Sequence, residues 1–214
     1  MTLSVAIMAH PRRRHAAERL ASSLDATIVW DERHDEWHTG ARAIAANDPT
    51  ATHHLVLQDD ALPVPDFLDH ATAALEHRPD DLVSFYLGTS RPPQWQAAVD
   101  DACMGAEDCG AAWITASDLL HGVAIAIPAA EIPAMLAWCE PFTVPYDQRI
   151  GMYWRRILDR RILYTWPSLV DHHDTPSLVQ HADGAPRTSV RRARLLGTPE
   201  GWDTTPIHAG QPTP

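Results

Sequence analysis

Short apolar runs alternate with segments of helical period along the first 87 residues, and this alternation constrains the fold most. The runs have the length of buried strands, whereas the segments between them repeat apolar residues every three or four positions. This order predicts an α/β domain with a mainly parallel sheet and helices on both faces. The expected strands span residues 4–9, 26–30, 54–58 and 82–87, and the helices between them span 15–24, 39–47 and 65–77.

The second part of the chain is less regular. Residues 88–110 carry prolines and cysteines without an apolar period, so we expect a functional loop there, such as a lid. Beyond about residue 184 the chain is rich in Pro, Thr, Gly and Arg, which predicts a loosely held or partner-bound tail. We therefore expect one domain over residues 1–184 and a tail over 185–214. Between the loop at residues 88–110 and the tail, the expected strands and helices span 113–116, 123–127, 131–139, 147–158 and 161–166.

The charge balance limits the classes of partner. The chain has 17 basic and 28 acidic residues, a formal net charge of −11, and every basic residue is arginine. The lack of lysine excludes P-loop phosphate binding and lysine Schiff-base chemistry, because both need an ε-amine. The acidic balance disfavours a protein that holds nucleic acid mainly through phosphate contacts. Small molecules or proteins are the expected partners.

Signals for export and for a membrane span are missing from the sequence. The apolar run at residues 3–9 precedes its arginines, which is the reverse of a secretory signal. No apolar stretch approaches the roughly 20 residues that a span requires. The three cysteines form no CxxC pair, which disfavours a zinc knuckle or a disulfide framework. We expect a cytoplasmic protein with free thiols.

The most informative motif is LVLQDDALP at residues 55–63, an apolar strand that leads directly into Asp59 and Asp60. Ligands of open α/β sheets bind beyond the carboxyl ends of the strands. Neighbouring side chains of an extended segment point to opposite sides, so we expect one of the two carboxylates to face a metal or a sugar. Alternatively, the pair caps the following helix or lies in a solvated loop.

A second polar cluster, DHHD at residues 171–174, is followed by His181. Imidazole and carboxylate together suit a divalent ion such as manganese. A polar surface loop is the alternative interpretation. A phosphohydrolase of the HD type would need these residues on facing helices, and Pro167 and Pro176 argue against a helix here.

Two further positions carry possible chemistry. Asp147 lies at the start of an expected helix, where a carboxylate either caps the helix or acts as a general base. The first loop, AHPRRR at residues 9–14, follows the first strand and opens a helix. Its backbone N–H groups and guanidinium groups could bind a diphosphate, and a solvated arginine face is the alternative.

In this order the features resemble a GT-A-fold glycosyltransferase, of the small bacterial and phage-encoded kind related to the lipooligosaccharide glycosyltransferases. The resemblance covers roughly residues 4–182 and implies a Rossmann-type, mixed, mainly parallel sheet. It also implies that the first loop, the end of the second strand and later segments bind a nucleotide-sugar donor. The donor-binding residues expected on this basis are Ala9, His10, Pro11, Arg12, Asp31, Gln58, Asp59 and Gly122.

The metal site also follows from the resemblance. The DXD motif of the family matches residues 58–60, so that Asp60 would bind the metal bridging the phosphates of the donor. Gln58 departs from the family pattern, because an acidic residue is usual there and glutamine adds no charge to the metal site. The phrase PSLVDH resembles a late P-x-L-V-x-H segment and makes His172 the second metal ligand, with His173 and His181 as alternatives.

Two more roles are implied by the resemblance. The segment HGVAIAIP at residues 121–128 resembles the one that lines the donor-sugar pocket, where Gly122 would allow close approach of the sugar. Asp147 falls where inverting members of the family keep their catalytic base.

The implied function is transfer of a sugar, with inversion, from a nucleoside-diphosphate sugar to a hydroxyl acceptor, with Mn²⁺ or Mg²⁺ as cofactor. A protein or glycan acceptor is favoured over a modified DNA base because of the net charge of −11, although arginines at 187, 191, 192 and 194 could form a local basic patch. Two other interpretations stay open. One is a metal-dependent phosphohydrolase built on the same residues, and the other is an inactive nucleotide-binding protein of the same fold.

Overall fold

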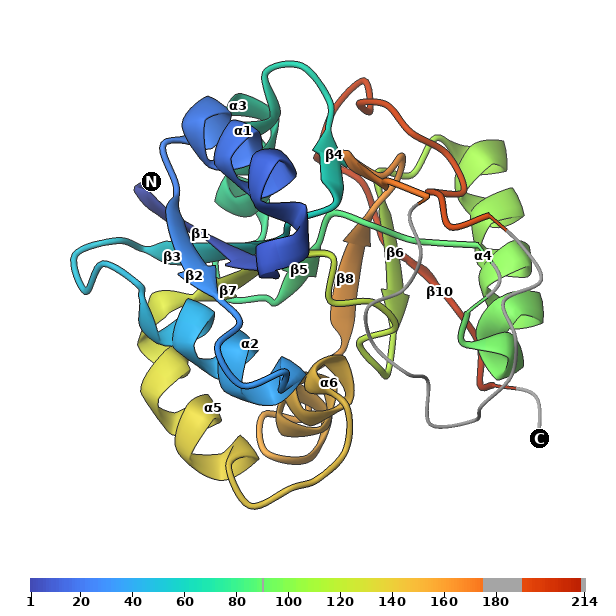
Figure 1. Ribbon diagram of the computed structural model, residues 1–214. Helices are drawn as coiled ribbons and strands as arrows, with labels where there is room; N and C mark the ends of the chain where they lie inside the picture. The colour runs from blue at the N-terminus through green and yellow to red at the C-terminus, as the bar shows by residue number, and fades with distance from the viewer. Residues whose placement is uncertain (90, 175–189, 213–214) are drawn as a thin grey trace.

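The computed structural model describes residues 1–89, 91–174 and 190–212, and these form an eight-stranded mixed sheet with helices packed against it (Figure 1). The strand order is β10-β6-β8-β5-β7-β3-β1-β2, and a separate two-stranded sheet pairs β4 with β9. Neighbours are parallel for β1–β2, β1–β3, β5–β8 and β6–β10, and antiparallel elsewhere. The strands are β1 Leu3–Ala9, β2 Thr27–Trp30, β3 His53–Gln58, β4 Ala61–Pro63, β5 Val83–Ser84, β6 Trp113–Ala116, β7 Ala124–Pro128, β8 Ile162–Thr165, β9 Val170–His172 and β10 Ile207–His208.

Helices cover both faces of the large sheet, as expected for an α/β domain. Helices α1 and α3 share one apolar core, and α2, α4, α5 and α6 share a second core on the opposite face (Figure 1). The helices are α1 Arg14–Leu24, α2 Glu36–Ala45, α3 Phe67–His77, α4 Gln96–Cys109, α5 Ile132–Cys139 and α6 Tyr146–Arg156, with short 3-10 turns at Pro11–Arg13, Pro93–Trp95 and Ala129–Glu131.

Strand β3 shows why the central strands read as continuous apolar runs. Leu55 and Leu57 point into the core beneath α1 and α3, whereas Val56 points into the other core. All three side chains are fully buried. A strand that is covered on both faces needs apolar residues at every position rather than at every second one.

The expected loop at residues 88–110 is wrong, because most of this segment forms helix α4. The buried face of α4 consists of Val99, Ala102, Cys103 and Ala106, which follow a helical spacing. Alanine and cysteine give only a weak apolar signal, so the helical period is hard to detect in the sequence.

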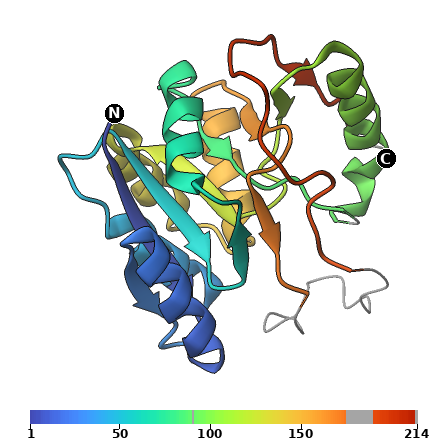
Figure 2. The same ribbon diagram turned by 90° about the horizontal axis from the view of Figure 1, so that it is seen from above.

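The expectation of a loosely held tail is also wrong for residues 190–212. In Figure 2 this segment, in red, runs back along the sheet to β10, beside α4. Strand β10 pairs in parallel with β6, and Trp202 packs against Trp113, whose Nε1 donates to the Trp202 carbonyl at 2.9 Å. This segment is held by single side chains such as Trp202 rather than by a periodic apolar face. The sequence therefore shows no apolar period there.

The fourth expected strand, residues 82–87, is reduced to β5, which runs in the same direction as β3 but is not its neighbour. Strand β7 lies between β3 and β5 and is antiparallel to both. No helix within the described residues is both long and apolar enough to cross a bilayer.

Candidate functional site

The candidate site lies at the carboxyl edge of the parallel strands β1, β2 and β3. Strand β7 is antiparallel to β3 and therefore begins at this same edge. The backbone N–H of Gln58 donates to the carbonyl of Val123 at 2.8 Å, which places Gly122 beside the end of β3. Polar residues from distant parts of the chain thus meet where ligands of α/β sheets usually bind.

The two-stranded sheet brings Asp60 next to His172. Ala61 of β4 pairs with His172 of β9, and the N–H of His173 donates to the carbonyl of Asp60 at 2.8 Å. As a result, His172 Nε2 lies 3.4 Å from Asp60 Oδ2. The His172 and Asp60 side chains are only 3% and 4% exposed. The two residues that the sequence predicts as metal ligands are therefore neighbours in a nearly dry site.

The hydrogen bonds determine which atoms of this pair are available to a cation. Nδ1 of His172 lies 2.8 Å from the carbonyl of His173 and must carry a proton, because a carbonyl oxygen only accepts. Burial lowers the pKa of His172, against the opposing effect of the Asp60 charge, so the ring is neutral and Nε2 holds a lone pair.

This lone pair faces a carboxylate, and the other Asp60 oxygen, Oδ1, is buried without a hydrogen-bond partner among the described residues. Two facing acceptors and an unpaired buried oxygen are costly unless a cation lies between or beside them. A histidine nitrogen and carboxylate oxygens fit a divalent ion such as manganese, and the backbone contact of Nδ1 is typical of a metal-binding histidine.

Arg13 is the cation that the structure itself places at this site. Its Nη1 lies 3.0 Å from Asp59 Oδ1 and also contacts Asp60 Oδ2. The other Asp59 oxygen accepts the backbone N–H of His10 at 2.7 Å. Asp59, which the sequence assigned to the donor site, therefore holds the first loop against the end of β3. Sequence reasoning did not single out Arg13 for this contact, and its only signal was the arginine run in that loop.

An aromatic side chain extends the site toward β7. The ring of Tyr86 lies 5.0 Å from the ring of His121 and 6.0 Å from that of His172, between ring centroids. Burial, with a further effect from His172, lowers the pKa of His121 to about 3, so this histidine is also neutral. Tyr86 was not predicted, and His121 was predicted only as part of the segment at residues 121–128, without a role of its own.

Asp147 lies in the first turn of α6, close to Gly122. A Cβ atom on Gly122 would lie 3.7 Å from the Cβ of Asp147. Asp147 is half-buried, and its Oδ1 accepts the N–H of Gln148 at 2.8 Å. Burial, together with the nearby Glu36 charge, raises the pKa of Asp147 to about 7. A carboxyl group with this pKa can take up or release a proton near neutral pH.

The glycine of this segment has a packing role of its own. A Cβ on Gly122 would lie 2.6 Å from Cε1 of Tyr146, and a Cβ on Gly40 of α2 would lie 2.3 Å from Cδ2 of the same ring. The buried Tyr146 ring is thus held between two glycines. The contact with Tyr146 is a sufficient reason for glycine at position 122, whether or not a sugar binds there. The role of Gly122 in donor binding therefore remains a prediction.

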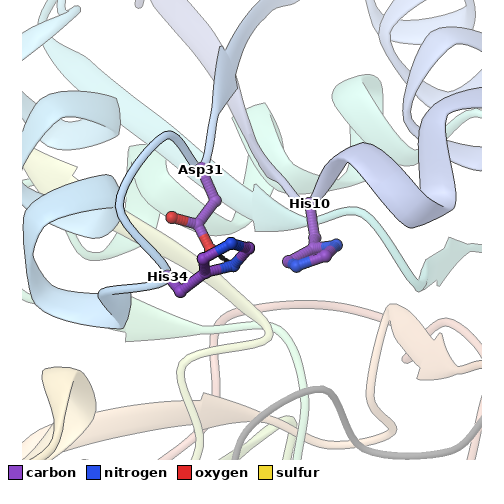
Figure 3. Close-up of side chains that lie close together, drawn as sticks. All are labelled: His10, Asp31 and His34. Atoms are coloured by element: carbon purple, nitrogen blue, oxygen red, sulfur yellow. Dashed lines mark ion pairs between the residues drawn. The ribbon is translucent and has the colours of Figure 1, made fainter.

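Three of the remaining side chains converge at the ends of β1 and β2 (Figure 3). One potential ligand atom from each of His10, Asp31 and His34 lies within 4.8 Å of the others. The Asp31 N–H donates to the carbonyl of Ala9 at 2.7 Å, which joins the two strand ends.

This cluster is less suited to a metal than the Asp60 pair. Nδ1 of His10 already accepts the N–H of Arg12 at 3.1 Å, so the neutral ring carries its proton on Nε2. The His34 side chain is 82% exposed. Oδ1 of Asp31 is held by Thr39 and by loop N–H groups, and these hydrogen bonds lower the pKa of Asp31 despite the opposing effect of burial.

The other predicted site residues have varied surroundings. Ala9 is buried within β1, whereas Pro11 and Arg12 are exposed in the 3-10 turn that follows. His173 is exposed and contributes its carbonyl rather than its ring, and His181 lies outside the described residues.

The expected basic patch is only partly described, because Arg187 also lies outside the described residues. Arg194 contacts Asp100 and Gln96 of α4, so its charge is partly neutralised.

A comparison with models of known protein families and a search of curated protein sequences each returned no match.

Proposed function

We propose that this protein is a metal-dependent glycosyltransferase with a GT-A-like domain, which transfers a sugar from a nucleoside-diphosphate sugar to a hydroxyl acceptor. The observation that carries this proposal is the buried pair of Asp60 and His172 at the carboxyl edge of the sheet, with two facing acceptor atoms and one oxygen that has no hydrogen-bond partner within the described part of the chain. Such an arrangement supports binding of Mn²⁺ or Mg²⁺ next to the loop that would hold a diphosphate.

The cation would be held by Asp60 and His172 and would neutralise the charge that builds on the departing diphosphate. The residues around the cation pair also favour a nucleoside diphosphate as the ligand. The first loop offers the exposed guanidinium of Arg12 to a phosphate, and the ordered carboxylate of Asp31 is placed to accept a ribose hydroxyl. The Asp59 carboxylate keeps this loop in position through the N–H of His10.

Asp147 is the proposed general base. Transfer requires that the acceptor hydroxyl lose its proton as the oxygen attacks the anomeric carbon, and a pKa of about 7 allows the carboxylate to accept it near neutral pH. Attack from the face opposite the leaving diphosphate would invert the anomeric centre. Asp147 lies beside Gly122 and so borders the same edge of the sheet as the cation pair.

Calorimetric titration with UDP, GDP and dTDP in the presence of Mn²⁺ tests the donor site. We expect one nucleotide to bind and its affinity to fall at least tenfold in Asp60→Asn and in His172→Ala. Matched controls are Asp69→Asn and His77→Ala on α3, whose exposed side chains should leave the affinity within a factor of two. Equal affinity in all five proteins would refute the proposed site.

Transfer itself is tested with sugars that carry a label and are attached to the nucleoside diphosphate that binds. Protein, glycan and DNA hydroxyls are offered as acceptors, and release of labelled free sugar is measured alongside. We expect transfer to a protein or glycan. Nucleotide binding with no loss of sugar from any donor would instead indicate a binding protein, and phosphate release from a generic phosphoester would indicate a hydrolase.

A further inference from the structure

Arg13 occupies the proposed metal site, although a guanidinium and a metal ion are both positively charged. Nη1 of Arg13 contacts Asp60 Oδ2, which is the same oxygen that faces Nε2 of His172 at 3.4 Å. The guanidinium also lies 3.0 Å from Asp59 Oδ1, and its side chain is only 16% exposed. One arginine therefore neutralises part of the charge of two adjacent, buried carboxylates.

A divalent cation and this guanidinium cannot share the site unchanged. A cation held between Asp60 Oδ2 and His172 Nε2 would lie a few ångströms from Nη1 of Arg13, which contacts the same oxygen, and two positive charges at such a distance in a nearly dry site repel each other strongly. Arg13 stands in the first loop, which has a contact with Asp59 that does not involve the guanidinium, because His10 N–H donates to the second oxygen of Asp59 at 2.7 Å. The side chain can thus move while the loop keeps its place.

We propose that Arg13 is a built-in competitor for the cation, which holds the carboxylates together in the empty protein and is displaced when the metal binds. The displaced guanidinium remains on the loop where the diphosphate is expected, and guanidinium groups bind phosphate oxygens through paired hydrogen bonds. Cation and nucleoside diphosphate then favour each other's binding, since the first frees a group that the second uses. This inference rests on the proposed function.

The test compares Mn²⁺ binding to the wild type and to Arg13→Gln by calorimetry without nucleotide. We expect Arg13→Gln to bind Mn²⁺ at least tenfold more tightly, because two buried carboxylates lose the guanidinium that contacts both of them. The matched control is Arg14→Gln, which removes the same charge from the next residue. Arg14 contacts Glu18 and the ring of Trp30 instead, so its loss should change the Mn²⁺ affinity by less than a factor of two.

The second half of the test concerns the diphosphate, and its probe is whichever of UDP, GDP and dTDP binds to the wild type. With Mn²⁺ saturating, Arg13→Gln should bind it at least fivefold more weakly than the wild type does, whereas Arg14→Gln should bind it equally well. Mn²⁺ should also raise the thermal midpoint of Arg13→Gln more than that of the wild type. If the glutamine variant fails to fold, Arg13→Met preserves more of the side-chain volume and carries the same expectations.

The possible failures are distinguishable. If Arg13→Gln binds Mn²⁺ no more tightly than the wild type, while Asp60→Asn loses Mn²⁺ binding, the role of Arg13 is refuted and the cation site stands. If neither the wild type nor Arg13→Gln binds Mn²⁺, the cation site is wrong, and the proposed function fails together with this inference.

Discussion

Replacement of Asp147 by asparagine should make the stability of the protein less dependent on pH. Burial and the Glu36 charge raise the pKa of Asp147 from 3.8 to about 7, so the folded protein binds this proton more tightly than the unfolded chain does. Between these two pKa values the folded state carries the extra proton, and the free energy of unfolding therefore falls as the pH rises. Above pH 7 the full cost of the ionised carboxylate is present.

The structure sets the size of this effect. A shift of about three units corresponds to about 4 kcal/mol at 1.36 kcal/mol for each unit, if the group were fully shielded from water. Asp147 is half-buried, and solvent screening reduces the expected value to about 1–2 kcal/mol. Asparagine has nearly the same shape and does not titrate, so the variant should gain this amount relative to the wild type between pH 4 and pH 8, about two thirds of it between pH 5 and pH 8.

Urea denaturation of both proteins at several pH values between 5 and 8 measures the difference directly. Other titrating groups are common to both proteins and cancel in the difference. Glu36→Gln removes a neighbouring charge and should shift the titration of Asp147 to lower pH, whereas Asp69→Asn, which changes an exposed side chain on α3, should leave the titration of Asp147 unchanged. A difference between Asp147→Asn and the wild type that does not change with pH would refute the reasoning.

Three further outcomes are expected. Asp147→Asn should leave donor affinity unchanged and lower kcat at least 100-fold in steady-state assays, because a base acts mainly in the transition state. Gly122→Ala should cost about 1–3 kcal/mol in urea denaturation, since its Cβ would overlap a buried tyrosine ring, whereas Gly201→Ala, with open space around it, should cost less than about 0.5 kcal/mol. Trp202→Ala should cost about 3 kcal/mol in the same assay, and a change below about 1 kcal/mol would show that the C-terminal segment does not support the fold.

The sequence predicts those elements whose apolar pattern is strong. Strands such as β1 and β3 and helices such as α1 and α3 have the expected places, with ends that differ by one or two residues. Helix α4 was missed because its buried face is built from small residues. Strands β4 and β9 are only three residues long and pair only with each other, so neither has an apolar pattern that the sequence would reveal.

The candidate site is partly predictable for a related reason. Asp60 and His172 were identified by the family resemblance, but their contact depends on a ladder between segments about 110 residues apart, which no local spacing encodes. The contact of Arg13 with both carboxylates depends in turn on the path of the first loop. Long-range pairing of this kind is decided by the whole fold rather than by neighbouring residues.

The ladder between β4 and β9 also makes the geometry of the site a matter of register. In the observed register Ala61 lies opposite His172, and Leu62 lies opposite Asp171. A slip by one residue would turn every side chain of one strand to the other face, and it would bring Asp171 opposite Ala61 in one direction and His173 in the other. Either slip removes the His172 ring from its place opposite Ala61, so the pair depends on this one alignment of two three-residue strands.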